Sequence, residues 1–327
     1  MGPATVRDLR AEFGSAANAF DAAPGLSGHG PALEEADALL ARAASCGARV
    51  LLPDDDDYPP ALHDLGDPPP WLFALGRLAV LDRPIVAIVG TRRATPYGLR
   101  VARGLARELA RAGVAVASGL ARGIDAAAHR GALDAGGDTA AVLGTGVDIA
   151  YPPAHRALHA EVAHRGLLLS EELPGDHASG GSFPRRNRII AALARATIVV
   201  EAPVKSGALI TAAHALELQR AVAAVPGPID VPASAGSNEL LRDGAIVIAD
   251  VDDALALAGA VRARGAAPEL EDAAERAAWA ALAGGALDVD ALAARAGLSS
   301  RAALAAVTAL ELRGLVSCAL TGEVRRR

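Results

Sequence analysis

The stretch IVAIVGTRRATPYG, residues 85–98, sets five consecutive apolar residues against a polar loop bounded by glycines. Apolar runs of similar length recur downstream, mostly separated by amphipathic stretches of helical length. Continuous apolar strands that alternate with helices are typical of a parallel sheet covered on both faces. The sequence therefore predicts an α/β fold, a Rossmann-like doubly wound domain with a mostly parallel sheet. Its expected strands are Ile85–Val89, Val114–Ala117, Thr139–Leu143, Gly166–Leu169, Thr197–Val200, Ala221–Val225 and Ala245–Ile248.

A polar or glycine-rich segment follows each of the first six expected strands. In doubly wound sheets, ligands lie beyond the carboxyl ends of the strands. We therefore expect these segments to share one rim of the sheet, where a binding site would form. The segments are GTRR (90–93), SGLARGID (118–125), GTGVD (144–148), SEEL (170–173), EAPVKSG (201–207) and PGPID (226–230).

The sequence before the core has a different pattern of apolar and polar residues. Residues 1–75 combine short helical patterns with proline and glycine, which predicts a small helical domain. Its last part, DPPPWLFALG (67–76), reads as an extended connector. We expect Trp71, Leu72 and Phe73 of this connector to dock onto the core.

After the core, which we expect to span residues 76–258, the pattern changes again. Residues 269–327 contain a periodic helix, a turn at Gly297, a serine cap and a second helix, which predicts a winged-helix domain. Its expected recognition helix offers mainly Arg301 and Arg313 among alanines and leucines. A helix with so few cations favours protein contact or regulation over readout of the DNA major groove.

Composition narrows the class of protein. The chain has 327 residues and a formal net charge of -6, and its two cysteines, Cys46 and Cys318, lie far apart. Neither a disulfide framework nor a thiolate zinc cluster is expected from this pair. The sequence lacks both a secretory leader pattern and an apolar run of about 18 residues. We therefore expect a cytoplasmic protein without membrane association.

The charge is distributed unevenly. Residues 85–250 carry a small net positive charge, whereas the flanks hold the excess of acidic residues. Lys205 is the only lysine in the chain, and Ser206 and Gly207 follow it. Where arginine is the default cation, a single lysine favours a site that needs a compact, flexible charge next to a closely approached backbone.

Familiar nucleotide and hydrolase motifs are absent. The segment between Gly90 and Gly98 lacks the G-x-G-x-x-G of dinucleotide-binding folds, and Lys205 lacks the glycines of a P-loop. Ser179 is not in a G-x-S-x-G elbow. His155 and His159 have the i, i+4 spacing of metal ligands, but the H-E-x-x-H pattern is missing. We expect no metal site and no cofactor.

Phosphate binding is better supported by the sequence. Glycines at the starts of helices free backbone N–H groups for anions, and basic side chains accompany them. Phe183 either stacks a nucleic-acid base or anchors the following helix in the core, and Asn187 either pairs with a base edge or caps a loop. The glycines are Gly90, Gly119, Gly123 and Gly207, and the cations are Arg92, Arg122, Arg185, Arg188 and Lys205.

Taken together, these segments resemble the DNA-processing protein A family (DprA, also called Smf). The resemblance spans most of residues 58–250, and its specificity comes from the ordered set of motifs. One departure is Ala208, which stands where a hydroxyl residue commonly follows K-S-G. The motifs are VGTRRATPYG, SGLARGIDAAAH, VLGTGVDIAYP, SFPRRNRIIAALA with VVEAPVKSGALITAAHAL, and VPGPID.

The resemblance implies a Rossmann-like core that binds single-stranded DNA (ssDNA) and dimerises through that core. It further implies a recombination mediator, not an enzyme, that protects incoming ssDNA and helps to load RecA in natural transformation or related DNA processing. It places DNA-phosphate contacts on Arg92, Arg185, Arg188 and Lys205. It also implies a SAM-like form for the amino-terminal helical domain, which is short here.

The sequence thus predicts one ssDNA-binding site along the rim. Two alternatives stay open: a nucleotide-cleaving Rossmann enzyme with Glu171 or Glu172 as general base, and a nucleotide-sensing adaptor that signals through the winged helix. The predicted site residues are Gly90, Thr91, Arg92, Ser118, Gly119, Arg122, Phe183, Arg185, Asn187, Arg188, Lys205, Ser206 and Gly207.

Overall fold

The computed structural model describes residues 38, 40–179, 181–261, 270–285, 287–319 and 322–326. The chain divides into two compact units, Met1–Ala263 and Arg264–Arg327. None of the helices in the described ranges combines the length and apolarity needed to cross a bilayer.

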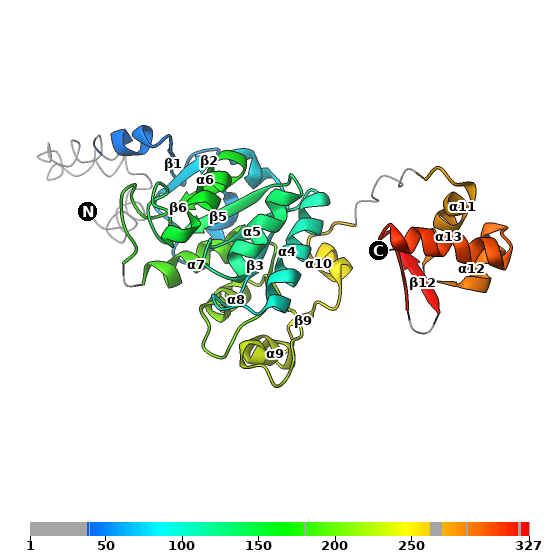
Figure 1. The fold of residues 1–327 in the computed structure, drawn as a ribbon. Helices are drawn as coiled ribbons and strands as arrows, with labels where there is room; N and C mark the ends of the chain where they lie inside the picture. Colours follow the sequence, from blue (N-terminus) through cyan, green and yellow to red (C-terminus); the bar gives the residue numbers. More distant parts are fainter. Residues whose placement is uncertain are drawn as a thin grey trace, which may run out of the picture. The chain divides into compact units, whose positions relative to one another are not determined.

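The first unit is built on a nine-stranded sheet with the order β1-β2-β6-β5-β4-β3-β7-β8-β9 (Figure 1). Neighbouring strands from β6 to β9 in this order run parallel, whereas β1 and β2 are antiparallel at one edge. This confirms the predicted α/β class and the mostly parallel sheet. The strands are β1 Arg49–Leu51, β2 Leu72–Gly76, β3 Ile85–Val89, β4 Ala115–Ser118, β5 Thr139–Leu143, β6 Leu167–Ser170, β7 Ala196–Val199, β8 Ala221–Ala224 and β9 Ile246–Val247.

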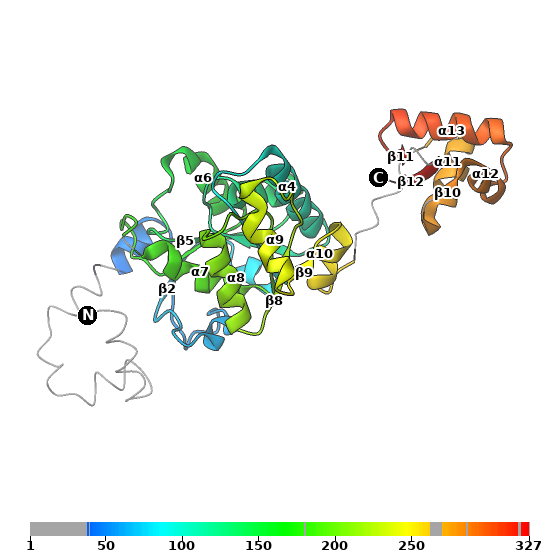
Figure 2. The ribbon, with the colours of Figure 1, turned by 90° about the horizontal axis from the view of Figure 1, so that it is seen from below.

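Helices cover both faces of the sheet because successive strand residues point to opposite sides. In β3, Ala87 and Val89 pack against α7 and α8, whereas Val86 and Ile88 pack against α4 and α5. Figure 2 shows α7, α8 and α9 on one face. One face carries α7 Ser182–Leu193, α8 Gly207–Glu217 and α9 Ala235–Arg242, and the other carries α4 Pro96–Arg111, α5 Ile124–Asp134, α6 Arg156–Arg165 and α10 Val251–Leu257.

The expected connector is part of the sheet. Leu72–Gly76 forms β2, which pairs with β6 on one side and β1 on the other. Leu72 and Phe73 are buried, and the Trp71 indole donates to the Glu171 carbonyl at 3.0 Å. The sheet therefore begins at β1, before the expected start of the core at residue 76, because pairing with a distant strand overrides the proline-rich local pattern. The predicted helical domain falls largely in residues 1–37, outside the described ranges.

The strand order reverses between β3 and β7. From β3 the chain moves outward through β4, β5 and β6, and it returns to the other side of β3 through α7 and β7. The loop after β3 leads to α4 on one face, and the loop after β7 leads to α8 on the opposite face. Diverging loops at such a switch point leave a crevice at the carboxyl edge of the sheet.

In its described residues, the second unit has three α-helices and a small sheet of order β10-β12-β11. Gly297 ends α12 with a φ of 66°, and the Ser299 side chain caps α13 by accepting from the Ala302 N–H. This confirms the winged-helix architecture and its predicted turn. The elements are α11 Ala273–Ala281, β10 Leu287–Asp288, α12 Val289–Ala296, α13 Ser300–Leu312, β11 Val316–Cys318 and β12 Glu323–Arg326, and their core is formed by Leu292, Leu310, Val316 and Val324.

Candidate functional site

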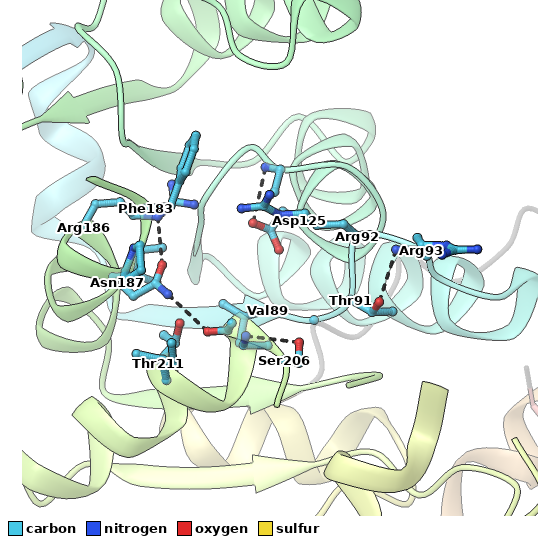
Figure 3. A pocket seen from close by; sticks show the side chains of 17 residues that line it. Val89, Thr91, Arg92, Arg93, Asp125, Phe183, Arg186, Asn187, Ser206 and Thr211 are labelled. Carbon is cyan, nitrogen blue, oxygen red and sulfur yellow. Dashed lines mark hydrogen bonds between the residues drawn. The ribbon is translucent and has the colours of Figure 1, made fainter. Parts of the chain in front are cut away.

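A pocket of about 310 Å³ lies at the switch point (Figure 3). Four segments line it: the loop after β3, the start of α5, one face of α7 and the start of α8. We call this the switch-point pocket and define it by Arg92, Asp125, Phe183, Arg186 and Ser206. The segments predicted to share a rim after β3, β4 and β7 do meet here.

The loop after β3 is held in place by Glu201 from the loop after β7. The Thr91 N–H donates to the Glu201 carbonyl at 2.6 Å. The Glu201 carboxylate accepts from both the backbone N–H and the hydroxyl of Thr95 at 2.8 Å. This leaves Arg92 and Arg93 exposed at the pocket mouth, with no ion pair to any acid in the described part of the chain. The loop thus presents two cations without an ion pair on a backbone that is held by hydrogen bonds.

Arg186, which the sequence analysis did not select, forms the floor of the pocket. Its side chain is buried, with 6% of the residue exposed, and donates to the carbonyls of Gly119 at 2.8 Å and Val142. Its Nε donates to the Asn187 Oδ1 at 2.9 Å. Burial lowers the pKa of the Arg186 guanidinium to about 10, while the Asp125 carboxylate acts in the opposite direction. The side chain therefore stays charged at neutral pH.

Asp125 is the counterion beneath this cation. Burial raises the pKa of Asp125, and the nearby Arg186 guanidinium and the N–H groups of Ala121 and Gly119 partly offset that rise. The two N–H groups donate to its Oδ2 at 3.4 and 3.2 Å. A Cβ on Gly119 would lie 2.3 Å from the Arg186 guanidinium, so only glycine fits there.

Phe183 separates the switch-point pocket from a second cavity of about 240 Å³. The Arg92 guanidinium carbon lies 5.2 Å from the centre of the Phe183 ring, within the range of a cation–π contact. The Tyr151 ring lies 5.2 Å away on the second cavity, and Tyr151 is 43% exposed. Arg122 also lines that cavity. The half-buried Phe183 ring therefore borders both cavities instead of packing wholly in the core.

The start of α8 closes the pocket from the opposite side. The Ser206 hydroxyl accepts from the Ala208 N–H at 3.3 Å, and Gly207 is exposed at the first helical position. The Asn187 amide donates to the Gly207 carbonyl at 3.2 Å, so Asn187 ties α7 to α8. Lys205 is exposed just before this helix with a φ of 63°. A helix start flanked by a lysine favours an anion.

Among the predicted site residues that do not line the pocket, three are held by other groups of the protein. Ser118 is fully buried, and its hydroxyl donates to the Ile88 carbonyl at 2.6 Å. The Arg188 side chain is 9% exposed and donates to both carboxylate oxygens of Glu171 at 2.8 Å. Arg185 is exposed but pairs with Glu172. One turn of an α-helix spans 3.6 residues. Positions 183, 186, 187 and 190 therefore face the pocket, while positions 185 and 188 face the carboxylates of Glu171 and Glu172.

The histidine pair of the sequence points to backbone carbonyls. A His155 ring nitrogen lies 2.9 Å from the Leu120 carbonyl, and a His159 ring nitrogen lies 2.9 Å from the Val147 carbonyl. Burial lowers the pKa of His159. Within the residues that the structure describes, no group of three or more His, Cys, Asp or Glu side chains is arranged to hold a metal ion.

Comparison with known proteins places these features in a family. The family model described as DNA recombination-mediator protein A matches residues 49–259, and the model of the DprA winged helix domain matches residues 262–319. The chain is 44% identical over 293 residues to the putative DNA processing protein DprA of Mycobacterium tuberculosis, which covers 83% of this chain and 75% of that protein. It is 44% identical over 206 residues to the DNA processing protein DprA of Streptococcus pneumoniae, covering 62% and 71%.

Two solved structures agree with the fold. The X-ray structure of DprA from S. pneumoniae matches with a TM-score of 0.62 and 41% identity, over 64% of this chain and 74% of that chain. A DprA structure from Helicobacter pylori, described as giving insight into a unique ssDNA binding mode, matches with a TM-score of 0.58 and 36% identity. That match covers 63% of this chain and 92% of the other.

Proposed function

This chain belongs to the DNA recombination-mediator protein A family, and we propose that it binds ssDNA at the switch-point pocket. The observation that carries the proposal is the meeting of unpaired cations, an accessible aromatic ring and a helix start around one cavity. The cations and the helix start can contact the phosphates of a single strand, and the aromatic ring can stack a base.

Each group has a distinct role in this proposal. Arg92, Lys205 and the start of α8 hold successive phosphates, and the buried Arg186 adds a fixed positive charge below them. Phe183 stacks a base, an interaction worth about 1–3 kcal/mol per base. None of these contacts reads a base edge, so binding is sequence-tolerant. We leave Arg185 and Arg188 out of the contact set because carboxylates already hold them.

We extend the proposal to a recombination mediator, which the family description supports, and we propose further that it protects ssDNA and helps to load RecA. The measurement is RecA-driven strand exchange on ssDNA coated with a single-strand-binding protein, with and without this protein. No stimulation would remove the RecA part of the proposal and leave DNA binding standing.

We also propose a homodimer formed through the first unit. In the described residues β9 pairs only with β8, and its two residues, Ile246 and Val247, are about half exposed. Such an open edge with apolar side chains favours association with a second copy. Val247→Arg should shift the sedimenting species to monomer, and an unchanged mass would exclude this edge as the interface.

Nothing in the site favours the enzyme alternative. Both candidate general bases are held by arginines, since Glu171 pairs with Arg188 and Glu172 with Arg185. Asp125, the carboxylate that lines the pocket, is buried against Arg186 and two backbone N–H groups. We therefore propose no catalytic step for this chain.

The test is fluorescence anisotropy with a labelled oligo-dT, competed by unlabelled ssDNA, matched duplex or a mononucleotide. We expect competition by ssDNA, weak competition by duplex and none by mononucleotide at equal concentration. The apparent affinity should fall with salt, with a slope of about −0.7 for each phosphate neutralised. Equal competition by the mononucleotide would contradict the proposal and support the nucleotide enzyme or sensor.

A further inference from the structure

Another basic cavity, of about 490 Å³, lies over the amino-terminal parts of α4 and α5. Five arginines line it and none of its lining residues is acidic. We call it the arginine groove and define it by these residues, which are Arg92, Arg93, Arg100, Arg103 and Arg130.

The charge in this groove is largely uncompensated. Arg103 pairs with Asp134, but Arg100 and Arg130 are exposed and make no ion pair with any described acid. Further along α4 the pattern differs, because Arg107 and Arg111 both pair with Glu108. On α4, the unpaired Arg100 therefore lies nearer the amino-terminal end than the paired arginines do.

That end is electrostatically the wrong one for cations. The amino-terminal end of a helix carries partial positive charge, which disfavours nearby basic residues. The first turn of α4 contains no acidic residue to offset Arg92 and Arg93 in the preceding loop. Positive charges at the amino-terminal end of a helix lower the stability of the protein unless an anion binds beside them. The groove therefore has the properties of an anion-binding surface.

The groove is continuous with the switch-point pocket. Arg92 and Arg93 line both cavities, and the start of α5 contributes to both through Asp125 on one side and Ala126 on the other. Arg100 and Arg103, three residues apart, lie on one face of α4, and Arg130 faces them from the adjacent α5. A strand leaving the pocket past Arg92 therefore enters a channel with further cations on both sides.

We propose that the arginine groove holds the phosphate backbone of ssDNA that extends beyond the switch-point pocket. This inference rests on the proposed function, and it adds a subsite that makes affinity depend on strand length. The groove offers guanidinium groups, and its lining residues include no Phe, Tyr or Trp, so it contacts phosphates and leaves the bases unread.

The test compares a short oligo-dT of about 6 nucleotides with a long one of about 20, a range that brackets typical ssDNA site sizes. The groove variant carries Arg100→Ala and Arg130→Ala. The matched control carries Arg107→Ala and Arg111→Ala, which also removes two positive charges, but from a part of α4 outside the groove. Binding is measured by anisotropy at about 50 and 200 mM salt.

For the long oligomer, we expect the groove variant to bind about tenfold more weakly at low salt and to lose about 1.4 from the salt slope, 0.7 for each phosphate contact. For the short oligomer, we expect wild-type affinity and slope. The control should match wild type with both oligomers. Arg100→Lys with Arg130→Lys should keep the wild-type slope, because a phosphate contact needs the charge and not the planar fork.

Three outcomes would overturn the inference. Equal weakening by the control variant would show a general charge effect, and unchanged binding of the long oligomer would show that no strand occupies the groove. Equal weakening with both oligomers would place the two arginines within the first subsite. Failure of the wild-type protein to bind either oligomer would instead defeat the proposed function, and the groove would fall with it.

Discussion

Arg186 places a charge inside the protein, where an isolated ion would cost several kcal/mol. The Asp125 carboxylate and the carbonyls of Gly119 and Val142 offset that cost. The guanidinium borders both cavities beside Phe183. A phosphate above it would therefore meet a cation already fixed by the fold, whereas Arg92 and Lys205 must be ordered on binding.

Replacing Phe183 tests whether the ring stacks a base or anchors α7. We expect Phe183→Leu to weaken oligo-dT binding about 5- to 150-fold, since stacking is worth about 1–3 kcal/mol, and Phe183→Tyr to keep most of the affinity. The salt slope should stay unchanged because no phosphate contact is lost. Anisotropy at two salt concentrations measures both. Unchanged affinity with a lower unfolding midpoint would identify the ring as a core anchor.

At the scale of elements, α7 divides its basic residues between two tasks. One face turns Phe183, Arg186 and Asn187 to the pocket, and the other turns Arg185 and Arg188 to the carboxylates after β6. The opening arginines of one short helix thus serve binding on one side and stability on the other. Substitutions on the two faces should separate these properties.

The comparison of Arg92→Ala with Arg188→Ala makes this separation measurable. Arg92→Ala should reduce the salt slope by about 0.7 and leave the free energy of unfolding within about 0.5 kcal/mol of wild type. Arg188→Ala removes the buried partner of Glu171 and leaves it only Arg185, whose Nε lies 3.7 Å away, so it should cost about 3–5 kcal/mol of stability. Urea unfolding and anisotropy give the two readouts. A stable Arg188→Ala protein with a reduced salt slope would return Arg188 to the DNA contact set.

The local sequence pattern predicted the helices and strands better than it predicted the contacts between them. The expected strands Ile85–Val89 and Thr139–Leu143 match residue for residue, because each is a continuous apolar run. β2 was interpreted as a connector, since its pairing with β6 joins residues more than 90 positions apart. Arg186 was missed because its partners come from β5 and the loop after β4, although its spacing from Phe183 and Ile190 on α7 was a usable signal.

At the scale of the molecule, a net charge of -6 coexists with a basic rim. Exposed charges more than about 10 Å apart are screened at physiological salt, so the charges near the pocket, and not the net charge of the chain, determine the local field. The winged-helix unit is a second candidate for nucleic-acid contact. Its α13 carries Arg301, and Arg313 at its end already pairs with Glu275.

Ultraviolet cross-linking of oligo-dT to the full chain, followed by peptide mapping, tests the central claim most directly. We predict cross-links in the peptides that contain Phe183 and Tyr151, where rings border the cavities, and their loss at high salt. The same experiment on Phe183→Leu is the control for the position of the strand. Cross-links confined to residues 270–326 would contradict the account, because they would place the DNA on the winged-helix unit.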